Sequence, residues 1–255
     1  MVIKMVLIHI LKVLVVLLSV AYSCESAPLP AQDLRVEYVP LPVLGVAVRR
    51  PRFSWALGNH LERGVSQSSY HITLWNTGSG EKAWDSGIVI SKETIGVSPS
   101  VDLKSDSSYQ LRVVWYDHKH QKSPVSTGIF STSFMEDSDW GDSKWISIPD
   151  PNDPRNQFRH SFHLPAKEVS RATCYISGLG YQRSWINGVR LGHQNNTLGA
   201  FSQFQRRVAY NTYDVSQILK PGKNVLSVLL GRGWYSLRED NFTKSLGTRR
   251  LAHER

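Results

Sequence analysis

The chain has 255 residues, 41% hydrophobic and 20% charged, a composition that is typical of globular proteins and excludes a disordered or fibrous one. Its net charge is +9, and the basic excess lies late in the chain: residues 155–255 hold 16 Lys and Arg against 5 Asp and Glu, whereas residues 1–154 hold 14 against 16. A basic surface can face an anionic partner, acidic neighbouring domains or solvent alone. No nucleic-acid-binding motif is present, so we expect no nucleic acid partner and take an acidic polysaccharide as the anionic candidate.

The first 23 residues have the pattern of a secretory signal peptide. Lys4 supplies the positive charge, residues 5–20 are largely apolar, and the small residues Ala21 and Ser23 precede Cys24 at the spacing of a cleavage site. The apolar run is short for a membrane span. We therefore predict a signal peptide at residues 1–23, a secreted, extracellular protein and no membrane contact after cleavage. A retained N-terminal anchor is the alternative.

Cysteines and glycosylation triplets are few. The two cysteines are Cys24 and Cys174; we expect no disulfide, and Cys174 as a small buried apolar side chain. Two Asn-X-Thr triplets begin at Asn195 and Asn241 in loop-like sequence. Both are predicted N-glycosylation sites and would suit a secreted eukaryotic protein.

Residues 30–136 contain a series of short segments in which apolar and polar residues alternate. Tyr70, Ile72 and Leu74 alternate with polar neighbours, and the run 111–116 repeats the pattern. A period of two is typical of a half-buried β-strand, and turn signals recur between the segments. The pattern predicts a β-sandwich of about a hundred residues. Every aromatic residue has a place in its core, so we propose no ligand site there.

An acidic stretch at residues 137–144 predicts a linker to a second domain at 145–240. Within that domain, Asp214 followed by Gln217 three residues later predicts a capped helix start. Residues 241–255 show no strand alternation, and we expect an irregular tail that marks a truncation.

The second domain contains a clear hairpin signal. Asn187-Gly188 separates the alternating segment 181–186 from the short segment 189–191. Asn-Gly is the strongest such signal, because a type I′ turn needs a positive φ at both central residues. Further on, the run 225–230 is apolar at nearly every position and predicts a central strand that is buried on both faces.

Several motifs resemble one family by their order and spacing. From residue 145 to residue 235 the chain resembles the N-terminal β-sandwich domain of bacterial-type α-L-rhamnosidases, glycoside hydrolase family 78, through ISGLGY, INGVRLG, YNTYDV and LKPGKNVLSVLLGRGWY. Upstream, LRVEYVP, RPRFSWAL, RGVSQSSYHITL, WDSG and YQLRVVWYD resemble the fibronectin-III/Ig-like module that precedes it in those enzymes.

The resemblance implies an all-β protein of two β-sandwich domains in tandem. The first is an Ig/fibronectin-III-like module and the second an incomplete jelly-roll-like sandwich. It also implies that the catalytic glutamates of the family lie in an (α/α)₆ barrel, far downstream of the part that is matched here.

Glycoside hydrolysis needs two carboxyl groups that flank the scissile bond. The carboxylates of residues 155–255 form no such pair in the sequence; they are Glu168, Asp214, Glu239, Asp240 and Glu254. The sequence also lacks the spacings of zinc sites, nucleophile elbows and phosphate loops. We therefore predict no catalytic residue, no metal site and no cofactor in this chain.

Sugar binding remains as a chemistry that the residues allow. Aromatic faces pack on sugar rings, and amide or guanidinium groups hold the hydroxyls. The carbohydrate-binding candidates are Trp185, Asn187, Arg207, Trp234 and Tyr235. Core positions are the alternative for Trp185 and Trp234, and the turn alone would explain Asn187.

Two classes of function follow. The first is a non-catalytic accessory region of an α-L-rhamnosidase-like enzyme, with a rhamnose-containing or acidic polysaccharide as partner. The second is a free-standing secreted protein that binds carbohydrate or mediates adhesion.

Overall fold

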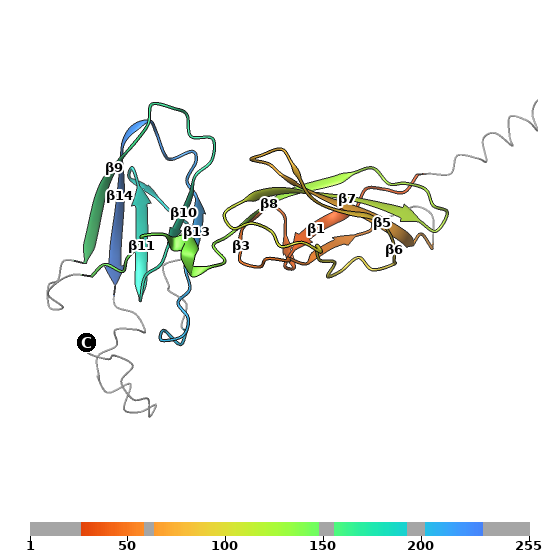
Figure 1. The fold of residues 1–255 in the computed structure, drawn as a ribbon, viewed down its shortest axis with the longest axis horizontal. Helices are drawn as coiled ribbons and strands as arrows, with labels where there is room; N and C mark the ends of the chain where they lie inside the picture. Colours follow the sequence, from red (N-terminus) through yellow and green to blue (C-terminus); the bar gives the residue numbers. More distant parts are fainter. Residues whose placement is uncertain (1–26, 59–63, 148–155, 193–201, 232–255) are drawn as a thin grey trace, which may run out of the picture. The chain divides into compact units, whose positions relative to one another are not determined.

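The structure is a computed structural model that describes residues 27–58, 64–147, 156–192 and 202–231. In these ranges every regular element is a β-strand, apart from the short 3₁₀ helix η1 (Asp137–Trp140) (Figure 1). The predicted all-β class is therefore confirmed. The chain divides into two compact units, residues 1–131 and 132–255.

The first unit is a sandwich of two sheets. One has the strand order β2-β1-β4 and the other β3-β8-β7-β5-β6. The strands are β1 (Gln32–Val36), β2 (Val39–Pro40), β3 (Val43–Val46), β4 (Phe53–Ala56), β5 (Gln67–Asn76), β6 (Lys82–Ile90), β7 (Ser108–Asp117) and β8 (Ser126–Thr132).

The core of the first unit follows the predicted alternation. On β5, Tyr70, Ile72 and Leu74 are buried, and they share one core with side chains from both sheets. The largest fully buried side chain is Trp115 on β7, whose indole N–H donates to the Leu29 carbonyl at 2.9 Å. Burial of large apolar side chains is the main stabilising term of such a sandwich.

The core of the first unit also contains a buried side-chain amide, that of Gln67. Gln67 is 2% exposed, and its Oε1 accepts a hydrogen bond from the Trp55 indole at 3.0 Å. Its Nε2 donates to the carbonyls of Ser91 and Glu93. The amide is thereby satisfied on both sides, as a buried polar group must be if it is not to destabilise the fold.

The second unit has a four-stranded sheet, β12-β11-β14-β9, and a two-stranded sheet, β10-β13. The two contribute to a small common core around Ile186, Leu191 and Val215, which Cys174, Tyr213 and Leu226 flank. The strands are β9 (Gln157–Leu164), β10 (Thr173–Ile176), β11 (Tyr181–Ile186), β12 (Val189–Arg190), β13 (Asn211–Asp214) and β14 (Gly222–Gly231). In the described ranges the narrow sheet packs against the wider one through this core.

The predicted hairpin is confirmed. Asn187 and Gly188 have φ of 51° and 82°, and the turn pairs Trp185 with Arg190. Gln182, Ser184 and Ile186 form the buried face of β11, whereas Tyr181, Arg183 and Trp185 form its more exposed face. The core position considered for Trp185 is therefore wrong: the residue lies half-buried on the side away from the core.

Two local predictions are also wrong. Strand β14 is central, between β11 and β9, but residues 225–230 are only half-buried, because just one of their two faces looks toward the second sheet. No helix starts at Asp214: its carboxylate accepts the Ser216 N–H at 2.9 Å and holds a single turn. Pro221 and Gly222, with a φ of 83°, then lead directly into β14.

The predicted linker region contributes to the second unit. Asp139 of η1 accepts the backbone N–H groups of Met135 and Glu136, which fixes the start of the helix. Phe134 stacks on Tyr175 of β10 with 3.8 Å between ring centroids, and Trp140 lies edge-on to Phe134 and Tyr210. These aromatic contacts fasten residues 134–140 to the two-stranded sheet.

Cys174 lies on β10 and carries a free thiol. Burial raises the pKa of the Cys174 thiol above its ordinary value, and burial likewise raises the pKa of Tyr213 on the paired strand β13. A raised pKa keeps the thiol protonated and therefore slow to react. Cys24 lies outside the described residues.

Candidate functional site

The predicted carbohydrate-binding residues do not form one cluster. Trp185 lies on β11 and Asn187 lies in the turn that follows it, whereas Arg207 lies in the irregular segment 202–210. Trp234 and Tyr235 lie outside the described residues, as do the predicted glycosylation sites. Those two are Asn195 and Asn241.

Asn187 has a structural role. Its Nδ2 donates to the Ile218 carbonyl at 3.0 Å and to Asn224 Oδ1 at 2.7 Å, and its Oδ1 accepts the Val225 N–H at 2.9 Å. Both amide hydrogens and one acceptor position are thus used inside the fold. The side chain ties the hairpin to the start of β14, which leaves it no free donor for a sugar.

Asn224 is the partner that the sequence did not reveal. It is fully buried, its Oδ1 accepts Asn187 Nδ2 and the Lys220 N–H, and its Nδ2 donates to the carbonyls of Lys220 and Gly222. The two asparagines lie 37 residues apart in the chain, so no local pattern could have paired them.

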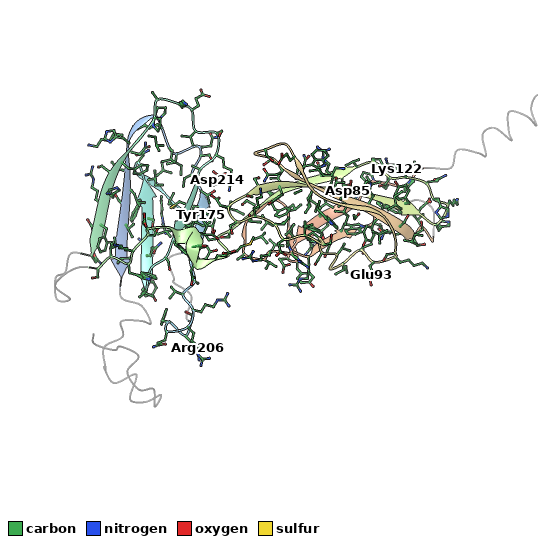
Figure 2. All side chains as sticks on the ribbon, viewed as in Figure 1. Asp85, Glu93, Lys122, Tyr175, Arg206 and Asp214 are labelled. Carbon is green, nitrogen blue, oxygen red and sulfur yellow. The ribbon has the colours of Figure 1, made fainter. Side chains whose placement is uncertain are left out.

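Arg207 is exposed in the segment 202–210. Its carbonyl accepts the Ser202 hydroxyl at 2.7 Å, and its N–H donates to the Gln203 carbonyl at 2.8 Å. Neighbouring Arg206, which makes the same bond to Gln203, is labelled beyond the strand ends in Figure 2. These backbone bonds close a tight turn that carries two exposed arginines.

Trp185 instead has companions on the sheet. Paired residues of antiparallel strands lie side by side on one face. The register places Arg190, Trp185, Ser227 and Arg159 in one row across β12, β11, β14 and β9. Arg183 lies two residues before Trp185 and therefore on the same face. Arg159, Arg183, Trp185 and Arg190 are called the basic face below.

Part of the basic face could have been derived from the sequence. A two-residue turn at Asn187-Gly188 fixes the pairing of Trp185 with Arg190, and the period of two adds Arg183. Arg159 lies on β9, two strands away, and its position depends on the long-range register between β9 and β14.

The described carboxylates mostly serve the fold. Glu37 binds Arg52 at 2.5 Å, and the hydrogen bond from that guanidinium holds the pKa of Glu37 below its usual value. Other engaged carboxylates include Asp33 with Arg35, Asp102 with Arg50, Asp117 with the N–H groups of Lys119 and Gln121, and Asp214 with Ser216.

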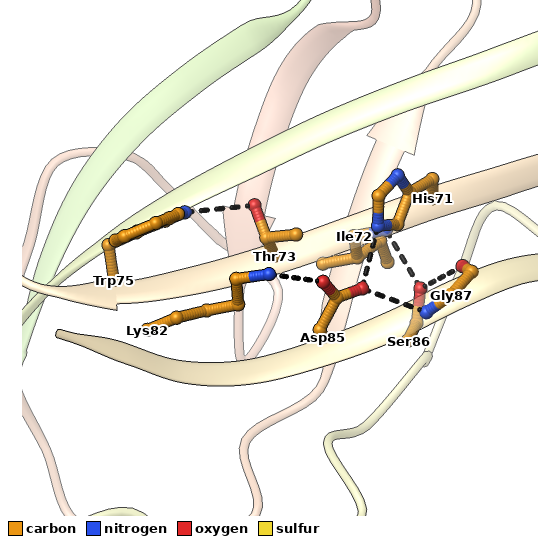
Figure 3. Close-up of polar contacts among 8 residues, drawn as sticks. All are labelled: His71, Ile72, Thr73, Trp75, Lys82, Asp85, Ser86 and Gly87. Atoms are coloured by element: carbon orange, nitrogen blue, oxygen red, sulfur yellow. Dashed lines mark hydrogen bonds and ion pairs between the residues drawn. The ribbon is translucent and has the colours of Figure 1, made fainter.

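On the first unit, His71 contacts Asp85 as the histidine and aspartate of a catalytic dyad would (Figure 3). His71 Nε2 lies 2.7 Å from Asp85 Oδ1, which also accepts the Gly87 N–H, and Lys82 Nζ lies 2.7 Å from Asp85 Oδ2. The hydroxyl of Ser86 accepts the Ile72 N–H and donates to the Gly87 carbonyl. The Ser86 hydroxyl is thus bonded to backbone groups and not to His71, so these residues do not form a catalytic triad. The contacts instead stabilise the irregular pairing of β5 with β6.

Replacing Asp85 with asparagine is expected to weaken the first unit and to flatten its response to acid. Lys82, the Gly87 N–H and His71 hold the pKa of Asp85 well below its usual range. A carboxyl with a depressed folded-state pKa stabilises above its unfolded pKa, about 4, and this stabilisation is lost as the pH falls toward the folded pKa.

The measurement is the melting temperature at pH 6 and at pH 2.5. The melting temperature of the wild type should fall further between pH 6 and pH 2.5 than that of Asp85→Asn does. At pH 6 the free energy of unfolding of the variant should be lower by about 1 kcal/mol, the net value of a hydrogen bond. Glu81→Gln, a neighbouring exposed carboxylate, is the matched control. An unchanged acid response in Asp85→Asn would contradict the assignment.

An open groove of about 590 Å³ lies on the first unit. Leu34, Leu41 and Ile129 are among its lining residues, and its one carboxylate, Asp33, is bonded to Arg35. Of its other polar lining residues, Gln110 accepts a hydrogen bond from Arg112 and Ser126 donates one to the Ala31 carbonyl, so these groups are used within the fold. Among the described residues there is also no cluster of His, Cys, Asp and Glu that could hold a metal ion, and no helix suited to crossing a bilayer.

Two family models match the chain in tandem. The model described as "Rha78A-like, N-terminal immunoglobulin domain" matches residues 31–136, and the model described as "Alpha-L-rhamnosidase N-terminal domain" matches residues 167–252. Their order is the order of modules that the sequence motifs predicted.

Curated relatives point to the same enzymes. An α-L-rhamnosidase of Formosa agariphila is 29% identical over 225 residues, 75% of this chain and 23% of the relative. An α-L-rhamnosidase of Streptomyces avermitilis is 38% identical over 97 residues, 38% of this chain and 9% of the relative.

Solved structures agree in fold and in coverage. The α-L-rhamnosidase of Dictyoglumus thermophilum matches with a TM-score of 0.72 and 31% identity over 83% of this chain and 26% of that one. That of Aspergillus terreus matches with a TM-score of 0.69 and 26% identity over 83% and 25%. The chain thus spans about a quarter of the length of these structures. It belongs to the N-terminal region of the bacterial-type α-L-rhamnosidases, glycoside hydrolase family 78.

Proposed function

We propose that this chain is the non-catalytic accessory region of an α-L-rhamnosidase-like glycoside hydrolase that acts on rhamnose-containing glycans. The observation that carries the proposal is the tandem match of the two N-terminal modules, 31–136 and 167–252, to enzymes that are about three times as long. The α-L-rhamnosidase activity belongs to those proteins by name; here it supports the choice of glycan.

The placement of the carboxylates supports a role outside the chemical step. A glycosidase needs an acid and a second carboxylate on opposite sides of one bond. Among the described carboxylates, Glu37 and Asp102 are bonded to arginines and Asp117 to turn N–H groups. Those contacts stabilise the first β-sandwich, and Asp33, the one carboxylate of its groove, is bonded to Arg35.

A secreted location belongs to the same proposal. It rests on the composition of residues 1–23, which has the charged start, apolar run and small-residue end of a signal peptide. An extracellular protein would meet rhamnose-bearing polysaccharides directly.

The purified 255-residue chain is expected to hydrolyse no rhamnoside, because the catalytic glutamates of the family are expected in a helical barrel and the described residues form two β-sandwiches. The measurement is release of p-nitrophenol from p-nitrophenyl α-L-rhamnoside. The α-L-rhamnosidase of Dictyoglumus thermophilum is the positive control, and the heat-treated chain is the blank. Release above the blank that co-elutes with the chain would refute the non-catalytic assignment.

A further inference from the structure

We propose that the basic face of the four-stranded sheet is a binding site for an acidic oligosaccharide, one that contains uronic acid units. In this site Trp185 stacks on one sugar ring while Arg183 and Arg159 hold carboxylates of the same ring or of its neighbours. The choice of carbohydrate as the ligand rests on the proposed function, and the face itself rests on the register of the strands.

The register surrounds one indole with three guanidinium groups. Arg190 is directly paired with Trp185, so their Cβ atoms lie about 5 Å apart. Arg159 lies in the same row two strands away, at about 10 Å, and Arg183 is two positions along β11, at about 7 Å. A pyranose ring on the indole therefore has exposed guanidinium groups within reach in two directions, Arg159 across the strands and Arg183 along β11.

The residues beside the aromatic side chains are small. Ser227 of β14 is the direct partner of Trp185, and Gly231 is the partner of Tyr181. A Cβ atom at Gly231 would lie only 3.1 Å from the Cβ of Tyr181, so glycine is what allows that tyrosine to occupy its place. On β14 the direct neighbour of Trp185 is thus a hydroxymethyl group, and the larger apolar residues of that face, Val225 and Leu229, stand only at the diagonal positions.

The indole has no bonding partner within the described residues. Its N–H makes no hydrogen bond there, and its ring makes no aromatic or cation–π contact with a described side chain, in contrast to the buried Trp115 and Trp55. A half-buried tryptophan with an unused donor suits a sugar, which offers an apolar ring face and hydroxyl acceptors together.

The charge of the face selects an anion. The four strands β9, β11, β12 and β14 contain no Asp or Glu, and their Lys and Arg residues are Arg159, Arg183, Arg190 and Lys223. Arg159, Arg183 and Lys223 are exposed on the same alternation as Trp185 or its row partners. Arg190 is half-buried, and its charge also acts on Tyr213.

Arg159 and Arg183 are exposed and form no ion pair with a described residue, whereas Arg35, Arg50 and Arg52 of the first unit all do. An unpaired guanidinium presents a planar fork that fits a carboxylate with two parallel hydrogen bonds. Charge complementarity thus points to a carboxylate-bearing ligand, and the indole points to a sugar ring as the carrier of that carboxylate.

The experiment measures binding of a de-esterified oligogalacturonate by isothermal titration calorimetry at low and at physiological salt. The same oligosaccharide with its carboxylates methyl-esterified is the matched ligand control, since it keeps the rings and loses the charge. We expect the esterified ligand to bind about tenfold more weakly, because charge-assisted hydrogen bonds are about twice as strong as neutral ones.

Four variants test the residues. Trp185→Ala is expected to weaken binding about tenfold, the loss typical of removing one stacking platform, and Trp185→Phe to restore most of it. Arg183→Gln should weaken binding about threefold or more. Arg206→Gln makes the same charge change on a separate segment and should weaken binding less than about twofold, because exposed charges farther apart than a Debye length are screened. Circular dichroism of each variant checks that it is folded.

The proposal fails if folded wild-type protein binds neither oligosaccharide at low salt; the face would then be a docking surface for acidic protein or open to solvent. Equal losses in Arg183→Gln and Arg206→Gln would reduce the effect to net charge and overturn the site. Unchanged binding in Trp185→Ala, or equal binding of both ligands, would overturn it as well. None of these results bears on the rhamnoside assay, so the proposed function stands or falls separately.

Discussion

Replacing Asn224 with alanine is expected to lower the free energy of unfolding of the second unit by about 3 kcal/mol, because a fully buried amide with several hydrogen-bond partners is lost at once. Oδ1 accepts from Asn187 and from the Lys220 N–H, and Nδ2 donates to the Lys220 and Gly222 carbonyls. Alanine leaves these groups without their partner and opens a cavity next to β14.

Native-state hydrogen exchange, read by mass spectrometry on peptides from each unit, measures this effect separately from the first unit. Exchange should accelerate in peptides of β11 and β14 and stay unchanged in peptides of β5 and β7. Asn211→Ala is the control: Asn211 lies on β13, and its side chain makes no hydrogen bond with a described residue. Equal effects of the two substitutions would show that the amide network contributes nothing of its own.

Replacing Trp115 with alanine is expected to destabilise the first unit by about 4 kcal/mol, within the range for removing a buried tryptophan. The ring is fully buried in the core that both sheets share, and its N–H donates to the Leu29 carbonyl. The substitution therefore removes packing on every side and leaves that carbonyl without its donor.

Thermal unfolding monitored by circular dichroism gives the readout for Trp115→Ala, with the transition of the first unit expected at a much lower temperature. Trp145→Ala is the matched control, because Trp145 is 65% exposed. A first-unit transition displaced no further by Trp115→Ala than by Trp145→Ala would contradict the burial on which the expectation rests.

Trp115 and Asn224 differ in how well their burial could be predicted from the sequence. Trp115 was predictable: it stands at an alternating position of a strand pattern, and the period of two places it on one face with Leu111 and Val113. The burial of Asn224 was not predictable, because the residue stands between Lys223 and the apolar run 225–230, and its partner Asn187 is brought to it only by the pairing of β11 with β14.

The residues of the candidate site likewise differ in how far the sequence could place them. Trp185 was identified from residue type and Arg190 follows from the Asn-Gly turn, both local properties of the chain. Arg207 and Asn187 were chosen by the same chemical criteria, yet one lies in a separate segment and the other is bonded inside the fold. Residue chemistry alone does not distinguish a side chain on a shared face from one that is used elsewhere.

The sequence by itself determined the all-β class, the tandem order of the two modules, the Asn-Gly hairpin and the family resemblance, because each depends on short periodic patterns and turn residues. Only the tertiary structure decided which face of β11 is buried. An alternating strand has two faces, and the pattern of polar Gln182 and Ser184 against aromatic Tyr181 and Trp185 would have favoured the wrong one. The buried face is the one that shares a core with β10 and β13, and that contact depends on residues too far along the chain for any local pattern to report.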